Sequence, residues 1–205
     1  MKLLLLCLSI FAHQVFAQKV VSKSMEFLPG TVAQIDARQC YKLRLESWPG
    51  DEIIADARME GEYRQQVLLQ MAKVGNTLIV SAGLDPIFKM PDDKLGAHKV
   101  VSIELKVRLP ENSEVSVLAK ATQLSANGTY EHLRITQSEG FCGIYGVSRL
   151  VEVHTQSADI LVASSGASIE ATSRYGIVGP NEIPRGEPYF KLHSISGNIT
   201  LVRTE

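Results

Sequence analysis

The chain has no large excess of charge of either sign. Its 205 residues include 21 Lys and Arg against 22 Asp and Glu. This balance argues against a nucleic-acid-binding protein, because such proteins usually carry a strongly basic surface. The hydrophobic share of 45%, with glycine and proline spread along the chain, also excludes a disordered tail, a collagen-like fibre and a multi-span membrane protein. One or two compact domains remain.

Long hydrophobic runs are missing after the N-terminus. Met1 and Lys2 precede an apolar stretch at 3–12, and the small residue Ala17 stands before Gln18, a pattern typical of a secretory signal. The apolar stretch is about half of the roughly 20 residues that a membrane-spanning helix needs. We therefore expect cleavage between Ala17 and Gln18, export to the periplasm, cell surface or medium, and no transmembrane segment afterwards.

Cysteines are few, and only Cys40 and Cys142 remain after the predicted cleavage. An oxidising compartment would allow a disulfide between them. Free cysteine also packs well as a small buried hydrophobic residue. Spacing along the chain does not fix the geometry of a disulfide, so both alternatives stay open.

Helical periodicity is scarce, and short runs of alternating apolar residues recur from end to end. The residues at 41–45, 103–109 and 115–117 predict strands that bury one face. The segment 63–74 fits both a strand and a helix face. Because Gly75 and Asn76 follow it and lead into the apolar run 77–80, we favour a hairpin with a two-residue turn. The sequence therefore predicts an all-β fold.

The second half contains a weak repeat, in which a Ser/Thr stretch leads into Gly, Asp or Asn and then an apolar residue. Its copies are TQSEGF (136–141), TQSADI (155–160), TSRYGI (172–177) and SISGNI (194–199). A period of about 20 residues built from short strands is typical of a β-solenoid. We expect one inward column of Phe141, Ile160, Ile177 and Ile199, and another of Thr136, Thr155, Thr172 and Ser194.

This pattern divides the chain into three parts. We expect a signal peptide at 1–17, an antiparallel β-rich cap at 18–109 and β-solenoid repeats at 110–205, the last two forming one continuous domain. A cap suits a solenoid, because the end coil would otherwise expose unpaired backbone groups. The alternative is a β-sandwich, since strands separated by regular turns also fit that fold.

Motifs for catalysis, metals and cofactors are absent. The sequence has no G-x-S-x-G elbow, phosphate-binding loop or paired-acid cluster in the repeats. The mature histidines are His98, His132, His154 and His193, none paired at helical spacing. His154 and His193 hold matching places in their repeats and could lie two coils apart in one column, where we favour a structural role. We expect a protein that is not an enzyme and has no catalytic residues, metal or cofactor.

Two proline-rich loops, at 84–98 and 178–189, interrupt the strand pattern and are the predicted places for ligand contacts. Trp48 precedes Pro49 and Gly50, where a tryptophan more often packs than binds sugar. The adjacent acids of the first loop would serve as catalytic carboxylates under an enzymatic alternative. The candidate ligand-binding residues are Phe88, Asp92, Asp93, Arg185 and Tyr189.

Several segments together resemble a known family. They are SADILV and SGNITL in the repeats, GDEIIADARMEG, GNTLIV and KVRLPENSEVSV. They are similar to exported bacterial β-strand-repeat domains of the "putative adhesin" type, including the GIN-domain head of auto-transporter adhesins. The resemblance covers most of residues 45–205. It implies a right-handed parallel β-helix or stacked β-roll, a bacterial envelope or surface location and no established enzymatic activity.

These observations favour an exported, adhesin-like envelope or surface module. It would bind a glycan or protein partner through the lateral face of its repeats or through the two loops. The alternatives are a carbohydrate-active enzyme on a short β-helix and a structural envelope protein that self-associates through its strand edges.

Overall fold

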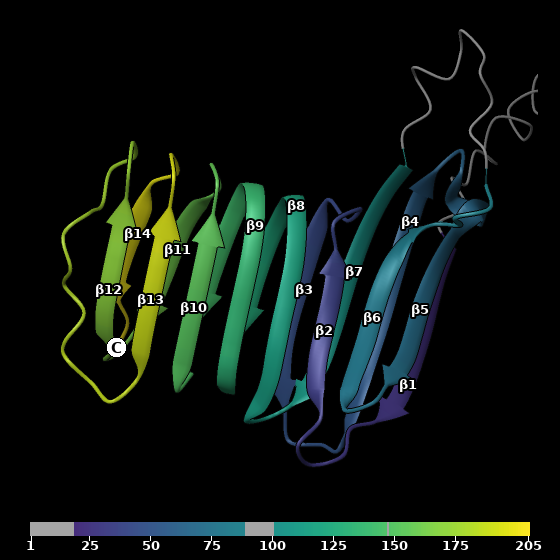
Figure 1. Cartoon of the computed structure of the whole chain (residues 1–205), viewed down its shortest axis with the longest axis horizontal. Helices are drawn as coiled ribbons and strands as arrows, with labels where there is room; N and C mark the ends of the chain where they lie inside the picture. The colour runs from purple at the N-terminus through teal and green to yellow at the C-terminus, as the bar shows by residue number, and fades with distance from the viewer. Residues whose placement is uncertain (1–18, 89–100, 147) are drawn as a thin grey trace, which may run out of the picture.

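The computed structural model describes residues 19–88, 101–146 and 148–205 (Figure 1). Within these ranges the regular secondary structure is β-strand, apart from one short 3₁₀ turn at Arg64–Gln66. The all-β prediction is confirmed. The strands are β1 (Lys19–Glu26), β2 (Val32–Ala37), β3 (Lys42–Trp48), β4 (Glu52–Gly61), β5 (Val67–Val74), β6 (Thr77–Leu84), β7 (Val101–Pro110), β8 (Ser113–Asn127), β9 (Tyr130–Tyr145), β10 (Leu150–Thr155), β11 (Asp159–Ser164), β12 (Ser168–Ser173), β13 (Tyr189–Ser194) and β14 (Ile199–Arg203).

The strands lie in two layers on either side of a common core (Figure 1). The front layer, which faces the viewer in Figure 1, has the order β5-β6-β2-β8-β9-β10-β13-β12. The back layer has the order β1-β4-β7-β3-β8-β9-β11-β14. β8 and β9 belong to both layers because each is long enough to turn the corner. The first half of β8 pairs with β2 and the second half with β3, so the mixed sheet is continuous but not closed.

Parallel pairing in register dominates from β8 onwards. Val115 pairs with Leu133, Leu133 with Val151, and Val151 with Phe190. All four side chains are buried, so equivalent strands stack with the same face turned inward. Each step along the stack is one strand spacing, about 4.8 Å. The internal repeat in the sequence therefore marks strands that stack in register.

Antiparallel pairing is confined to the N-terminal end. It joins β1 to β4, β4 to β7 and β5 to β6. The β5–β6 hairpin confirms the predicted turn, where Gly75 has a positive φ of 60°. β2 and β3, however, pair in parallel with β8, so region 18–109 is less uniformly antiparallel than predicted. One hydrophobic cluster extends from Ala33 to Leu201 and so through both predicted regions.

The last two strands of the front layer do not follow chain order. β13 lies between β10 and β12 and pairs in parallel with both. In the back layer β14 pairs with β11, and Val178 bridges to Ile199. Residues 168–178, here called the outer coil, are therefore at the end of the stack. Residues 189–203, the inserted coil, lie beneath them although they come later in the chain.

The loop between these coils is hydrogen-bonded to the stack. The backbone N–H of Ala167 donates to the Pro184 carbonyl at 2.9 Å, and that of Ser168 to the Pro188 carbonyl at 2.7 Å. The Ile183 side chain is buried. These contacts hold the returning chain against the connection that leads from β11 to β12.

The inward columns differ from the predicted ones. Ile160 and Ile199 pair as expected, but the residue of β9 in this column is Cys142, because Phe141 pairs with Asp159. Ile177 is 74% exposed on the outer coil. The expected membership of Phe141 and Ile177 is therefore wrong. Degenerate repeats leave the register of the strands uncertain by one residue. A shift of one residue in the register turns each side chain to the opposite face of the sheet.

The hydroxyl column is also shifted by one residue. Thr136 and Thr172 point outward in the row of His154, whereas Thr155 pairs with Ser194 inside the corner. There Thr155 Oγ1 donates to Ser194 Oγ at 2.8 Å, and Ser194 Oγ accepts the N–H of Gly197 at 2.8 Å. Both hydroxyls are buried, so these bonds satisfy polar groups at the turn.

The predicted signal peptide 1–17 and its cleavage point at Ala17 and Gln18 lie outside the described residues. Among the residues that are described, none forms a helix long and apolar enough to cross a membrane.

The inserted position of β13 predicts an unequal effect of two truncations. Phe190 of β13 is fully buried, so Phe190→Ala should lower the free energy of unfolding by about 3–5 kcal/mol. Ile169, on β12 at the end of the stack, is only partly buried, and Ile169→Ala should cost about 1 kcal/mol. Urea unfolding of both variants measures the difference. Equal losses, or a larger loss for Ile169→Ala, would contradict the strand order.

Candidate binding surface

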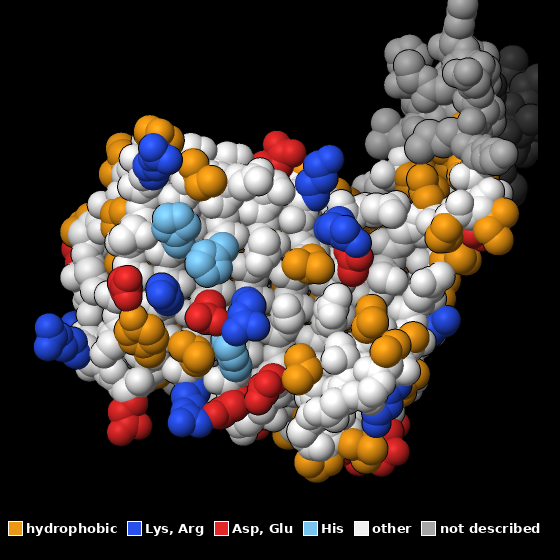
Figure 2. Space-filling model, in the orientation of Figure 1, with side chains coloured by type: hydrophobic (Ala, Val, Ile, Leu, Met, Phe, Trp, Pro, Cys, Tyr) orange, Lys and Arg blue, Asp and Glu red, His pale blue; other side chains and the backbone are white. Residues whose placement is uncertain are grey.

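The front layer carries a polar face over β9, β10, β13 and β12, where charged side chains gather (Figure 2). Its side chains alternate with the buried residues of the same strands, because successive residues of a strand point to opposite sides. We call it the histidine face, and its residues are His132, Arg134, Glu152, His154, Glu170, Thr172, Tyr189, Lys191 and His193.

The register arranges these side chains in rows across the strands. One row runs Arg134, Glu152, Lys191 and Glu170, and a second runs Thr136, His154, His193 and Thr172. The expected common column of His154 and His193 is present. The two residues are direct neighbours rather than two coils apart, because the inserted coil displaces the outer coil.

Glu152 organises one end of the face. Its Oε2 lies 2.9 Å from His132 Nε2 and accepts bonds from Arg134 Nε at 3.1 Å and Nη2 at 3.0 Å. The bonds from His132, and then from Arg134, lower the pKa of the Glu152 carboxyl from its ordinary value. The ionised carboxylate therefore holds both nitrogen side chains against the sheet.

Two further contacts orient side chains on the same face. Tyr189 donates its hydroxyl to Glu170 Oε2 at 2.6 Å, and this bond raises the pKa of the Tyr189 phenol. His193 Nδ1 lies 3.0 Å from Thr172 Oγ1. The rings of His154 and His193 are 5.9 Å apart between centroids and tilted by 54°. Several hydrogen-bonding groups therefore have fixed positions on an open surface.

The loop residues predicted to bind a ligand are not brought together. Phe88 follows β6 near the N-terminal end of the stack and packs on Tyr63 with 5.1 Å between ring centroids. Arg185 and Tyr189 lie at the opposite end, beside the outer coil (Figure 1). Asp92 and Asp93 lie outside the described residues. Tyr189 is thus the predicted residue that joins the histidine face.

Trp48 packs close to its own turn. Its indole N–H donates to the Glu52 carbonyl at 3.1 Å. The ring covers Gly50 so closely that a Cβ at that position would lie 2.2 Å from the indole. This contact agrees with the packing role that the sequence favoured for Trp48.

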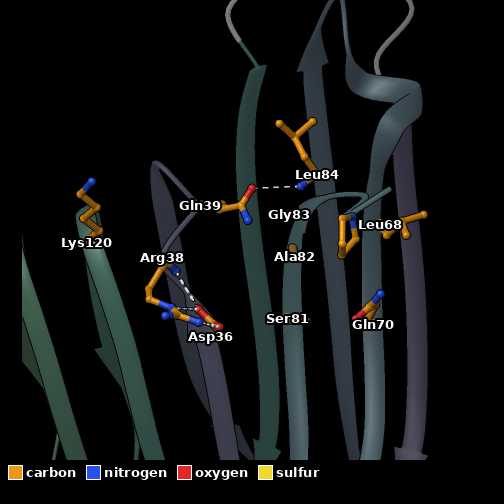
Figure 3. Close-up of a pocket in the computed structure, with 11 residues that line it drawn as sticks. Asp36, Arg38, Gln39, Leu68, Gln70, Ser81, Ala82, Gly83, Leu84 and Lys120 are labelled. Carbon is orange, nitrogen blue, oxygen red and sulfur yellow. Dashed lines mark hydrogen bonds and ion pairs between the residues drawn. The ribbon is translucent and has the colours of Figure 1, made fainter. Parts of the chain in front are cut away.

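A second surface feature is a hollow of about 490 Å³ in the front layer, lined by the ends of β2, β5 and β6 (Figure 3). Arg38 turns toward Asp36 and forms bonds of 2.6 and 2.9 Å to its carboxylate, and these lower the pKa of Asp36. Gln39 accepts the N–H of Leu84 at 3.0 Å. Lys120 stands apart on β8 (Figure 3). Two of the polar side chains that line the hollow, Arg38 and Gln39, are therefore already hydrogen-bonded within the protein.

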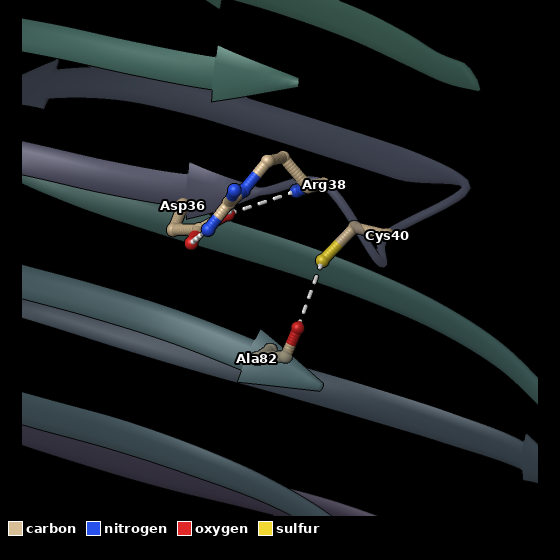
Figure 4. A network of polar contacts seen from close by, with 4 residues as sticks. All are labelled: Asp36, Arg38, Cys40 and Ala82. Atoms are coloured by element: carbon tan, nitrogen blue, oxygen red, sulfur yellow. Dashed lines mark hydrogen bonds and ion pairs between the residues drawn. The ribbon is translucent and has the colours of Figure 1, made fainter. Parts of the chain in front are cut away.

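Cys40 and Cys142 are both free and buried, so the disulfide between them is not present in the structure. Cys40 Sγ donates to the Ala82 carbonyl at 3.7 Å, below the Asp36–Arg38 pair (Figure 4). Burial, with a smaller effect of the Asp36 charge, raises the pKa of the Cys40 thiol to about 12. Burial alone raises the pKa of Cys142 to about 12. Neither thiol is a nucleophile near neutral pH.

Across the described ranges, no three His, Cys, Asp or Glu side chains converge as metal ligands. The hydrogen-bonded side chains of the histidine face lie on an open sheet, without the enclosed pocket that most small-molecule sites have. The arrangement can form hydrogen bonds and ion pairs with a partner laid across the strands.

The fold has counterparts among solved structures, although no family model and no curated protein matches the sequence. A "putative cell adhesion protein" from Clostridium sporogenes ATCC 15579 superposes with a TM-score of 0.64 at 12% identity, over 91% of this chain and 100% of that chain. The likeness is one of fold. It supports the predicted resemblance to adhesin-type domains at that level.

Two weaker similarities cover the same part of the chain. A "putative adhesin" from Bacteroides fragilis NCTC 9343 has a TM-score of 0.31 at 11% identity, over 91% of this chain and 99% of that one. A "putative lipid binding protein" from Parabacteroides distasonis ATCC 8503 has a TM-score of 0.29 at 10% identity, over 90% and 97%.

The free cysteines predict a simple labelling result. In the chain that starts at Gln18, a thiol reagent at about pH 8 should leave the native protein unlabelled, because the high pKa values suppress the thiolate. After unfolding without reductant, both Cys40 and Cys142 should react, as counted by mass spectrometry. An unfolded chain that reacts only after reduction would instead show a disulfide.

The lowered pKa of Glu152 predicts a pH-dependent contribution to stability. Glu152→Gln should lower the free energy of unfolding near pH 7 by about 0.5 kcal/mol, because the ion pairs are exposed to solvent. The pKa of Glu152 is lower in the folded chain than in the unfolded chain. The stabilisation from its ion pairs is therefore complete above the unfolded pKa of about 4.3, and it is lost as the pH falls through the lowered folded pKa.

Urea unfolding of the parent and the variant across this acidic range tests the effect. The difference between them should shrink as the pH falls. Glu139→Gln, at an exposed position of β9 outside the histidine face, is the matched control and should show no such trend. A difference that grows in acid would be the wrong sign for this mechanism.

Proposed function

We propose that this chain is an exported, non-enzymatic module of the bacterial cell envelope or surface that binds a partner through the histidine face in an adhesin-like manner. The observation that carries the proposal is the face itself. It presents oriented donors and acceptors from four neighbouring strands on one open surface. Export rests on the predicted signal at 1–17, and the final location is the periplasm, the cell surface or the medium.

The proposed architecture is a right-handed β-solenoid whose coils include the long strands β8 and β9. Its support is the parallel, in-register pairing that extends from β8 to β12 in the front layer and from β8 to β14 in the back layer. Antiparallel strands at the N-terminal end would serve as the cap, with the boundary near residue 109. A β-sandwich of two mixed layers is the alternative description of the same stack.

A glycan suits the histidine face better than a large apolar partner. The face has four basic or acidic side chains in one row, Arg134, Glu152, Lys191 and Glu170, in which positive and negative charges alternate. Such a row has no net charge and offers many hydrogen bonds, as a neutral polysaccharide requires. Tyr189 adds an amphipathic ring that is 41% exposed.

Self-association is a second candidate function, and the outer coil favours it. Tyr175 and Ile177 are 70% and 74% exposed beside the free edge of β12. An exposed strand edge with apolar neighbours can pair with another chain. The enzymatic alternative depends on Asp92 and Asp93, which lie outside the described residues, and no observation favours it.

Binding of a panel of envelope and host polysaccharides tests the proposed function. The chain should be retained on at least one polysaccharide and should release no oligosaccharide. The double change Tyr189→Ala and Lys191→Ala should weaken retention about tenfold or more, since it removes two side chains from the face. Lys106→Ala, on the back layer, is the control and should keep full retention.

Three results would contradict this function. Released products would indicate an enzyme, and retention that survives the double change would place the binding elsewhere. No retention on any polysaccharide, together with oligomers that grow with concentration in sedimentation, would favour the self-associating alternative.

A further inference from the structure

His154 and His193 form a pair of exposed imidazoles on neighbouring parallel strands. His154 lies on β10 and His193 on β13, directly opposite each other in the register. The ring centroids are 5.9 Å apart, and the rings are tilted by 54° rather than stacked. Both residues are exposed and, as partners in the parallel register, project from the same side of the sheet.

Thr172 orients one of these rings. Its Oγ1 lies 3.0 Å from His193 Nδ1. When Nδ1–H donates to this hydroxyl, Nε2 keeps its lone pair and is free to bind a metal. A hydrogen bond of this kind to the nitrogen that does not bind the metal is usual for metal-binding histidines, because it orients the ring and makes it more basic.

Charges of both signs lie beside the histidine pair. In the neighbouring row Glu152 lies two residues before His154, and Lys191 lies two residues before His193. The two opposite charges offset one another at the edge of the pair. On the other side, Ile195 lies two residues after His193 and is uncharged, and the guanidinium of Arg174 lies over the Tyr175 ring, 5.0 Å from its centroid.

We propose that His154 and His193 together bind a divalent transition-metal ion of the Zn²⁺ class, with water in the remaining coordination positions. Imidazole nitrogen is a preferred ligand of these ions, at about 2.0–2.1 Å for Zn²⁺. Small rotations of the two exposed side chains bring one nitrogen of each to a shared ion. The ion would lie on the histidine face, but the inference does not rest on the proposed glycan binding.

The inserted coil creates this site. If the coils followed chain order, β12 would lie beside β10 and Thr172 would be the neighbour of His154. Because β13 occupies that position instead, the two histidines meet and Thr172 falls on the far side of His193. With two protein nitrogens, the ion should be held less tightly than in a four-ligand structural site.

Zn²⁺ titration of the purified chain, without an affinity tag and at about pH 7.5, tests the proposal. Isothermal calorimetry should show one ion bound per chain. His154→Asn and His193→Asn should each weaken the affinity about tenfold or more, and Thr172→Val by a smaller factor. Ca²⁺ and Mg²⁺ should not compete, because they require oxygen ligands.

His132→Asn is the matched control, since His132 is on the same face but bonded to Glu152, and it should leave the affinity for Zn²⁺ unchanged. Circular dichroism should show the same fold for all four variants, because the altered side chains are on the surface. The proposal is overturned if the chain does not bind Zn²⁺, if the His154 and His193 variants bind as the parent does, or if His132→Asn removes binding.

Discussion

The parallel hydrogen-bonded register between equivalent strands is the constraint on which the rest of the structure depends. It places Val115, Leu133, Val151 and Phe190 in one buried column and so supplies a core that extends along the stack. The same register decides what appears outside, because every inward residue is followed by an outward one. The same strand pairing therefore determines both the buried core and the exposed histidine face.

The sequence predicted the parts of the fold that local patterns determine. Alternating apolar residues identified the strands, and Gly75 with Asn76 identified the β5–β6 turn. The repeats showed that strands of the second half are equivalent. They did not fix the register, since Phe141 and Cys142 are both apolar and either could occupy the inward column.

The candidate face was harder to predict, because its residues are distant in sequence. His132, Glu152 and His193 belong to three different strands, and no local motif connects them. Matching positions in the repeats did indicate that His154 and His193 share a column. Their direct contact depends on the position of β13, which follows from long-range packing and from the loop between β12 and β13 rather than from either strand's own sequence.

The inserted coil also limits how this molecule can lengthen. In a stack that follows chain order, a duplicated repeat at the C-terminus simply adds one more layer to the end. Here the C-terminal coil is covered on its outer side by residues 168–178, and Val178 already bridges to Ile199. In the front layer β12 already occupies the outer edge of β13, and in the back layer Val178 bridges to the first residue of β14. A coil that followed β14 in the chain could therefore extend the front layer only along β12, the strand two places earlier in chain order, and not along β13.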